Sequence, residues 1–345
     1  MPVSLLTIPV STNSHARLDE CLREGLPRAL DLPAFSNSKI RRLIVSGSVA
    51  VNGKRETRPA AGLRRGDSVT VAYDAERFAH EKKPDDIACE IAERDVLYED
   101  DLLIAVNKPA GIPTEGTVVG SRDSLHGAVR RFLAARRENG EGSLELPYVG
   151  LHHRLDRETS GVVLFTKKKE ANAAVHALFA DRAAKKTYLA LAARQAVNPA
   201  RRAKPGAVLG KAGDEVTVDN RLGRVSPKSA RAKWGAVGEA EGAPAKTAFT
   251  VIGAYPLALL VRCEPYTGRT HQIRVHLSGL GAPILGDPLY GGPEALNDGF
   301  PLPRVMLHAA ALSFPHPADG RQITVISPEP ADFSRCLAHC RDGAD

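Results

Sequence analysis

One short segment of the chain, residues 151–161, concentrates side chains that could do acid–base or nucleophilic chemistry. It holds His152, His153 and the carboxylate of Asp156, and it precedes an apolar, β-branched run that predicts a strand. A loop that leads into a buried strand can hold a catalytic group rigidly, which makes Asp156 the first candidate. On composition alone, an aspartate here is more often a turn or capping residue, and the two histidines are more often structural.

A second segment, residues 266–277, combines basic and polar groups at regular spacing. From Gln272 onward, apolar side chains alternate with Arg274 and His276, which is the pattern of a half-buried strand. This pattern predicts that Arg274 faces a polar cleft or solvent. A simple surface arginine is the plainer explanation of the same spacing.

Other kinds of reactive site find little support in the sequence. It contains no glycine-rich phosphate loop, no pair of Cys-pair motifs and no nucleophile elbow. Cys336 and Cys340 stand four residues apart with His339 between them, so a metal pair is conceivable. Because no second pair completes a tetrahedral set, we expect no metal site.

The candidate groups need a framework, and residues 95–330 predict a single catalytic domain. Its β-like runs are mixed with a few helices and do not form regular βαβ units, so we expect an α+β fold with a mixed, mainly antiparallel sheet. The interval 198–245 is rich in Ala, Gly, Pro, Lys and Arg, and we expect a surface excursion there, with room for short strands. Strands are expected at residues 102–106, 161–166, 186–191, 257–263 and 323–326, and a helix at 171–184.

Residues 15–75 read as a separate small unit. Two short amphipathic helices are expected first, and the turn Asn52–Gly53 between alternating segments then predicts a hairpin. Lys39, Arg41 and Arg42 lie on the second helix, where charge alone would indicate a solvated basic face. The expected elements are helices at 17–24 and 38–47, and extended segments at 49–51 and 68–73.

Bulk composition sets the remaining expectations. The 345 residues carry a net charge of +7, which favours a polyanionic partner without deciding it. Residues 76–94 are strongly charged and are expected to be a linker, and residues 331–345 a C-terminal tail. Five scattered cysteines do not indicate a disulfide framework. With no apolar run long enough to span a bilayer and no secretory signal pattern at the start, we expect a cytoplasmic monomer without a membrane partner.

A resemblance to a known family decides what spacing leaves open. Residues 153–161 resemble the catalytic signature of the RluA-type pseudouridine synthases. Similar segments follow in the family's order and cover nearly all of residues 95–318, and the ordered set is far more specific than any single motif. The N-terminal pattern is similar to the small S4-like RNA-binding module that precedes this domain in many family members. The further matching segments are residues 108–111, 186–188, 267–274, 286–290 and 308–309.

The resemblance implies a role for each matching residue. Asp156 occupies the position of the essential aspartate, and Arg274 that of the arginine that pairs with it. Arg154 matches the arginine that helps to displace the target base, and Tyr188 the tyrosine that lies against the uracil and is a candidate base. The remaining expected substrate contacts are His153, Thr159, Arg269 and His271 in the catalytic domain and Lys39, Arg41 and Arg42 in the N-terminal unit.

The sequence departs from the family pattern in two places near this site. His152 stands where an apolar residue is usual, and Val162 and Val163 replace a more common leucine pair. Neither change touches a proposed catalytic role.

The implied activity is the isomerisation of uridine to pseudouridine in RNA. This chemistry needs no metal or redox cofactor, because the substrate supplies both the leaving base and the new nucleophile. An arginine within about 4–6 Å would keep the carboxylate ionised despite partial burial. Attack at the sugar, attack at the base and elimination all remain open for Asp156, and we rank stacking above proton removal for Tyr188, since an ordinary phenol has a pKa of about 10.

Three alternatives accompany this interpretation. The S4-like module fits large-subunit ribosomal RNA, while transfer RNA stays open as the target. A non-catalytic RNA-binding or ribosome-assembly protein would need only a basic surface, so the joint presence of Asp156, Tyr188 and Arg274 argues against it. A uracil-directed glycosidase that stops after bond cleavage would release free uracil.

Overall fold

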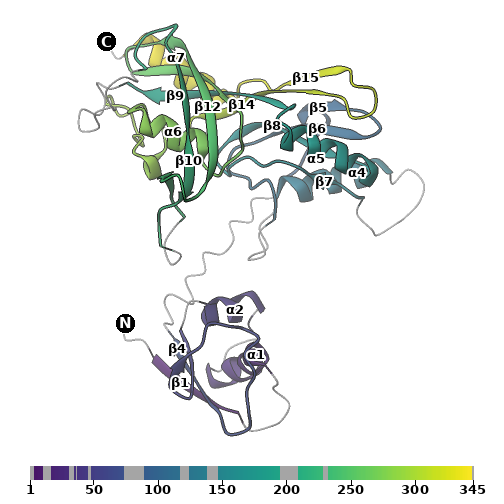
Figure 1. The fold of residues 1–345 in the computed structure, drawn as a ribbon, viewed down its shortest axis with the longest axis vertical. Coiled ribbons are helices and arrows are strands. Elements are labelled where there is room, and N and C mark those ends of the chain that lie inside the picture. The colour runs from purple at the N-terminus through teal and green to yellow at the C-terminus, as the bar shows by residue number, and fades with distance from the viewer. Residues whose placement is uncertain are drawn as a thin grey trace. The chain divides into compact units, whose positions relative to one another are not determined.

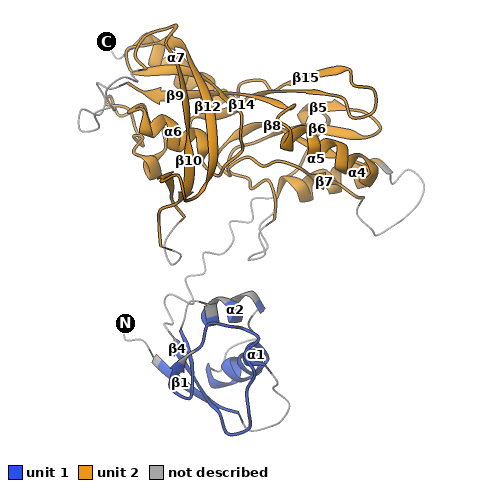
Figure 2. Cartoon of the chain, viewed as in Figure 1, with its two compact units in different colours: residues 1–87, 117–122 blue, residues 88–116, 123–345 orange. Residues whose placement is uncertain are grey.

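The computed structural model describes two compact units (Figures 1 and 2). The smaller lies within residues 1–87 together with 117–122, and the larger comprises residues 88–116 and 123–345. Within the residues described, no helix is both long and apolar enough to cross a membrane. The described residues are 4–10, 17–30, 35, 37–45, 48–73, 89–116, 124–137, 147–194, 209–227 and 232–343.

The N-terminal unit packs two helices against an antiparallel sheet of order β1-β4-β2-β3. The predicted hairpin is present, with Asn52 and Gly53 both at positive φ. Its start lies earlier than the expected residue 15, because β1 pairs along its whole length with β4. The elements are β1 (Ser4–Pro9), α1 (Leu18–Leu30), α2 (Asn37–Val45), β2 (Val49–Val51), β3 (Lys54–Arg55) and β4 (Ser68–Tyr73).

The larger unit is built on one sheet of order β11-β10-β12-β13-β9-β14-β8-β6-β5, with β15 beside β14 and β7 beside β8. Among the described strand pairs only β8–β14 is parallel, which confirms the expected α+β fold with a mixed, mainly antiparallel sheet. Its strands are β5 (Val96–Glu99), β6 (Leu103–Lys108), β7 (Gly150–Leu151), β8 (Ser160–Thr166), β9 (Lys185–Ala193), β10 (Glu215–Arg224), β11 (Trp234–Val237), β12 (Ala243–Ala254), β13 (Ala258–Pro265), β14 (Leu307–Pro315) and β15 (Gln322–Ile326).

Helices cover two halves of this sheet: the β9–β13 half has one main hydrophobic cluster, and the half with β6 and β8 has two. Figure 1 shows α6 and α7 beside the β9–β13 half, and α4 and α5 beside the half that contains β6 and β8. The helices are α4 (Leu125–Arg137), α5 (Asn172–Ala180), α6 (Gln272–Gly279) and α7 (Ala331–Asp342), with short 3-10 turns η1 (Glu93–Asp95), η2 (Lys169–Ala171) and η4 (Pro288–Tyr290).

The two halves meet where β8 runs parallel to β14. Gly161 stands at this meeting point with φ +121°, and a Cβ there would lie 2.2 Å from the carbonyl oxygen of Ala309. Only glycine fits so close an approach in this conformation. The contact sets the position at which β8 begins, directly after the segment that contains Asp156.

The predicted strand at residues 272–277 is wrong, because these residues form helix α6. The alternation that suggested a strand assumed one buried and one exposed face. Instead every residue from 272 to 277 is buried, including Arg274 and His276. A helix that is buried all round carries no amphipathic signal in its sequence.

Two further expectations change in the larger unit. The interval 198–245 includes β10, which pairs with β12 from Glu215 to Leu222 and so belongs to the sheet rather than to a surface excursion. Within the expected tail, α7 packs into the core through Phe333, Cys336, Leu337 and Cys340. Their spacing of three and four residues is the apolar stripe of a packed helix.

The same packing explains the C-terminal cysteine pair as part of the core. Within the described ranges, no cluster of three or more metal-ligating side chains occurs. The end of the expected linker 76–94 is also structured: Cys89 is buried and η1 leads into β5. Residues 74–88 lie outside the described residues.

Candidate active site

The loop between β7 and β8 carries Asp156 at the junction of the two halves. Leu155 beside it is buried, and its backbone exchanges two hydrogen bonds with Thr114, at 2.9 and 3.1 Å. The N–H of Thr159 donates to the carbonyl of Asp156 at 3.0 Å and closes a turn. The Asp156 side chain is 26% exposed, so the loop is anchored while the carboxylate stays accessible.

A buried lysine is hydrogen-bonded to the backbone of this loop. Lys108, at the end of β6, is fully buried, and its Nζ donates to the carbonyls of Pro109, Arg157 and Thr159 at 2.9, 3.0 and 2.8 Å. Burial lowers the pKa of Lys108 to about 7, while the charges of Glu158 and Asp156 oppose that shift. Three carbonyl acceptors match the three donors of an ammonium group, so the site suits the protonated form.

Helix α6 carries Arg274, whose positive charge lies beside Asp156. Nη1 of Arg274 donates to Oδ2 of Asp156 at 3.1 Å. Its Nε and Nη2 donate to the two carboxylate oxygens of Asp287 at 2.7 and 2.8 Å. Burial disfavours the guanidinium charge, yet Asp287 and Asp156 raise the pKa of Arg274 above its usual value, so it stays charged. The bidentate pair with Asp287 fixes the plane of the guanidinium and leaves Nη1 for Asp156.

A histidine and a tyrosine complete the wall beside this ion pair. Nε2 of His271 lies 3.8 Å from Oδ2 of Asp156, and its Nδ1 is hydrogen-bonded to the hydroxyl of Tyr290 at 2.8 Å. That hydroxyl also accepts the backbone N–H of Trp234 at 3.0 Å. The Tyr290 ring lies 5.0 Å from the Arg274 guanidinium carbon, within the range of a cation–π contact.

Tyr188, on β9, packs against the cores of both halves. Burial raises the pKa of its phenol, and the negative charge of Asp156 raises it further. The phenol is therefore protonated near neutral pH and presents an uncharged ring. This environment suits a flat packing partner better than a base.

The remaining expected contacts differ in accessibility. The Arg154 side chain is 66% exposed and has Glu115 at 3.8 Å, and Arg269 is exposed with its Nε on the carbonyl of Pro244. Thr159 is buried. In the N-terminal unit Arg41 is exposed, whereas the side chains of Lys39 and Arg42 lie outside the described residues.

The His153 side chain contacts β8 and α5. Its Nε2 accepts the backbone N–H of Leu164 at 2.9 Å, and its ring stacks on Phe179. Burial lowers the pKa of His153 to about 3, so the imidazole is neutral at physiological pH. These contacts anchor the loop to β8, which is a different task from the substrate contact expected for this residue.

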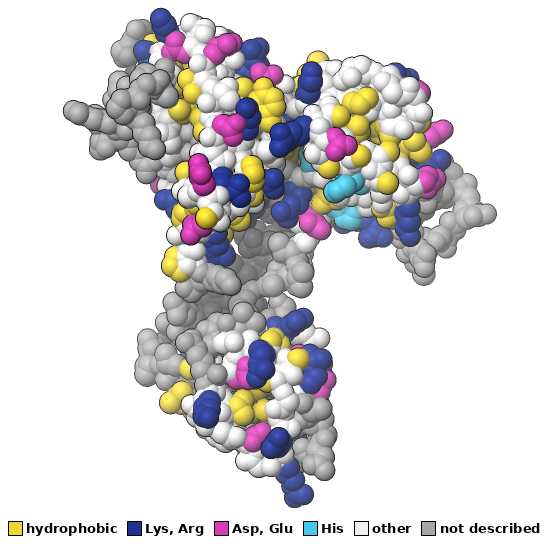
Figure 3. All heavy atoms as spheres, in the orientation of Figure 1, with side chains coloured by type: hydrophobic (Ala, Val, Ile, Leu, Met, Phe, Trp, Pro, Cys, Tyr) yellow, Lys and Arg dark blue, Asp and Glu magenta, His cyan; other side chains and the backbone are white. Residues whose placement is uncertain are grey.

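Sequence reasoning missed two residues of this site. Asp287 lies in a matching segment, residues 286–290, but received no role, although a buried arginine requires a carboxylate partner. Lys108 also lies in a matching segment, and only its complete burial reveals the loop contacts. On the surface of the larger unit, Lys and Arg side chains gather toward the middle of the face shown in Figure 3, which suits a polyanionic ligand.

Comparisons with known proteins agree on one family. A family model described as RNA pseudouridylate synthase matches residues 102–279, which include Asp156, Tyr188 and Arg274. The ribosomal large subunit pseudouridine synthase C of Escherichia coli (strain K12) is 35% identical over 335 residues, 94% of this chain and 93% of that protein. The ribosomal large subunit pseudouridine synthase D of Zymomonas mobilis is 33% identical over 322 residues, 92% of this chain and 91% of that protein.

Solved structures agree with the sequence relatives. Human RNA pseudouridylate synthase domain containing 4 is similar with a TM-score of 0.54 and 25% identity, over 71% of this chain and 92% of that chain. Human RNA pseudouridylate synthase domain containing 1 gives a TM-score of 0.50 at 25% identity, over 72% and 90%.

Proposed function

The chain belongs to the RNA pseudouridylate synthase family, and on this premise we propose that it isomerises uridines of large-subunit ribosomal RNA, with Asp156 as the catalytic carboxylate. It is an RNA pseudouridine synthase and therefore an isomerase. The relatives named for the large ribosomal subunit support the choice of RNA. The arrangement of Asp156, Arg274 and Asp287 carries the assignment of the site.

The reaction conserves the atoms of the nucleotide. The bond between N1 of uracil and C1′ of the ribose breaks, the base turns, and a bond forms between C5 and C1′. The proton on C5 is lost to solvent, and N1 gains a proton. The substrate therefore supplies both the leaving group and the nucleophile, and the protein has to extract, orient and deprotonate the base.

Asp156 must be ionised to act on the sugar or the base. Nη1 of Arg274 lies 3.1 Å from Oδ2 of Asp156 and places a positive charge beside it, while the 26% exposure of Asp156 leaves it open to substrate. Asp287 holds two of the three guanidinium nitrogens, so Arg274 does not fold over the carboxylate and occupy both of its oxygens. We assign Arg274 to charge and orientation.

Arg154 and Tyr188 are suited to two tasks that follow extraction of the base: filling the place that it leaves and packing against the uracil ring. Unstacking a base costs a few kcal/mol, and an exposed arginine such as Arg154 can fill the vacated place by stacking and phosphate contact. The ring of Tyr188, whose hydroxyl is protonated and uncharged, can lie against the uracil. Its raised pKa weighs against a role as the base that removes the C5 proton.

Tritium release tests the activity and the role of Asp156 together. RNA labelled with tritium on C5 of uridine loses the label to water when pseudouridine forms. Large-subunit rRNA should release tritium with the wild-type protein and none above background with Asp156→Asn. If Asp156→Asn releases tritium as fast as wild type, Asp156 is not the catalytic group. If free uracil accumulates instead, the protein is a glycosidase.

The target is tested by mapping pseudouridines across total RNA from cells with and without the gene. We expect the loss of at least one site in large-subunit rRNA. Loss confined to transfer RNA would overturn this target while leaving the chemistry intact.

We further propose that the N-terminal unit is an S4-like module that binds RNA phosphates. Arg41 on α2 and Lys54 after the Asn52–Gly53 turn are both exposed. Replacing both with Ala should weaken RNA binding and reduce the salt dependence of log K by roughly 0.7–0.9 per lost phosphate contact. The matched control replaces the exposed Arg23 and Arg28 of α1. Equal effects of the two double variants would contradict a specific basic face.

We also propose that the protein acts as a cytoplasmic monomer. All five cysteines are free and buried, as suits a reducing compartment. Light scattering over a range of concentrations should give a constant mass near 36.9 kDa. A mass that doubles with concentration would contradict the monomer.

A further inference from the structure

Buried cations hold three successive backbone carbonyls directly after Asp156. Lys108 donates to the carbonyls of Arg157 and Thr159 at 3.0 and 2.8 Å. Nη1 of Arg304 reaches the carbonyl between them, that of Glu158, at 3.2 Å. The same Nη1 contacts the carbonyls of Val305 and Leu307 at 3.0 and 3.2 Å, so Arg304 joins the loop to the start of β14.

The other edge of Arg304 binds the C-terminal helix. Its Nε and Nη2 donate to the two carboxylate oxygens of Asp332 at 2.6 and 3.1 Å. Asp332 lies in the first turn of α7, and the residue after it, Phe333, is fully buried. Burial disfavours the Asp332 charge, but the hydrogen bond and the charge of Arg304, together with the backbone N–H of Phe333, lower the pKa of Asp332, so the pair is ionic at neutral pH.

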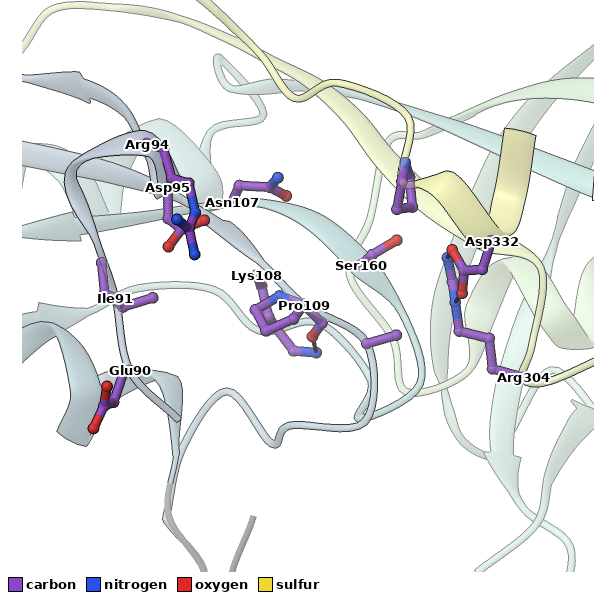
Figure 4. Close-up of a pocket in the computed structure, with 12 residues that line it drawn as sticks. Glu90, Ile91, Arg94, Asp95, Asn107, Lys108, Pro109, Ser160, Arg304 and Asp332 are labelled. Atoms are coloured by element: carbon purple, nitrogen blue, oxygen red, sulfur yellow. Dashed lines mark hydrogen bonds and ion pairs between the residues drawn. The ribbon is translucent and has the colours of Figure 1, made fainter. Parts of the chain in front are cut away.

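The ion pair of Arg304 and Asp332 borders a cavity. Figure 4 shows Arg304 and Asp332 side by side at a cavity of about 460 Å³, which Lys108 and Ser160 also line. Close packing normally fixes a segment to a fraction of an ångström. Beside this cavity, charge-assisted hydrogen bonds from Lys108 and Arg304 to the loop carbonyls add to that restraint.

From this geometry we infer that Arg304 and Asp332 are positioning residues for the isomerisation. Asp332 orients Arg304, Arg304 holds the carbonyl of Glu158, and this restrains the backbone two residues from Asp156. Helix α7 thereby contributes to the alignment of the catalytic loop. The inference rests on the proposed role of Asp156.

The competing explanation is an ion pair that only attaches α7 to the domain. Replacing Arg304 is a poor test, because it would leave several buried carbonyls unpaired and endanger folding. Asp332 is 27% exposed, and Asp332→Asn keeps its size while it removes the charge. The matched control is Asp298→Asn, because Asp298 pairs with His339 on the same helix and otherwise accepts the backbone N–H of Phe300.

Single-turnover kinetics with enzyme in excess separates the two explanations. At saturation, the rate constant reports alignment in the folded enzyme, and an unfolded fraction leaves it unchanged as long as folded enzyme stays in saturating excess over the RNA. We expect the Asp332→Asn rate constant to fall by about 10- to 100-fold, as misplacement by about 1 Å would produce. RNA affinity should stay within about twofold, since phosphate contacts supply most of it. Asp332→Glu should recover part of the rate, and Asp298→Asn should keep the wild-type rate.

The outcomes are distinct. Equal rate constants for Asp332→Asn and Asp298→Asn overturn the inference, as does a slower Asp332→Asn rate constant that returns to the wild-type value when the concentration of folded enzyme is raised. An inactive wild-type protein, or an active Asp156→Asn variant, would instead overturn the proposed function.

Discussion

Asp287→Asn is the sharpest perturbation of the candidate active site. Asp287 is fully buried and accepts hydrogen bonds from Nε and Nη2 of Arg274 at 2.7 and 2.8 Å. Asparagine keeps one acceptor oxygen but turns an amide N–H₂ toward a guanidinium donor. Arg274 then retains its charge and loses its bidentate partner. The guanidinium should swing toward Asp156, cover its carboxylate and compete with the substrate.

The expected magnitude follows from breaking a buried ion pair by removing one partner, which costs roughly 3–5 kcal/mol. Because asparagine preserves one hydrogen bond, we expect about 3 kcal/mol, the lower end of that range. For a unit of this size the melting temperature should fall by roughly 6–12 °C. Misalignment of Arg274 and Asp156 should lower kcat by about 100-fold, or about 2.7 kcal/mol of transition-state stabilisation.

Tritium release measures the rate, and denaturant unfolding of the larger unit measures the stability. The matched control is Asp219→Asn, which breaks an exposed pair with Lys246 at 3.0 Å and should cost less than about 1 kcal/mol. The reasoning is refuted if folded Asp287→Asn turns over within twofold of wild type. A loss of stability no larger than that of Asp219→Asn would also refute it.

Two further predictions concern an exposed arginine and a buried, neutral histidine. Arg154→Ala should lower kcat/KM by at least about 10-fold, while the free energy of unfolding changes by less than about 0.5 kcal/mol because Arg154 is exposed. The control Arg157→Ala, at a neighbouring exposed arginine, should change neither quantity. An unchanged kcat/KM for Arg154→Ala would contradict its proposed role. Burial lowers the pKa of His276 from 6.5 to about 4, so the unfolded chain takes up this proton first and the free energy of unfolding falls as pH drops from 6.5 to 4. His276→Gln should remove up to about 1.4 kcal/mol per pH unit of that slope in denaturant titrations, and an unchanged slope would show that folding does not lower the pKa of His276.

Local patterns were sufficient for a good part of the molecule. The Asn52–Gly53 hairpin, strands β6, β8, β9 and β13 and the α+β class depend on side-chain period and turn chemistry over a few residues. The resemblance of the segment around Asp156 to a known signature was likewise sufficient to predict the family, because that segment is continuous in the chain.

Long-range packing decided what those patterns could not. The alternation at residues 272–277 fits a strand and a fully buried short helix equally well, and only the surrounding sheet selects α6. The stripe of α7 was likewise visible in the sequence, but its place against β13 depends on the finished sheet.

The sequence by itself therefore determined which carboxylate is the candidate and which element follows it. Resemblance had already paired Arg274 with Asp156, although 118 residues separate them. Only the tertiary structure revealed the groups that hold this pair in place: Asp287 binds Arg274, and Arg304 reaches the loop across 146 residues. A buried charge needs a partner, but the sheet topology chooses which one, because it alone brings distant groups within hydrogen-bond distance.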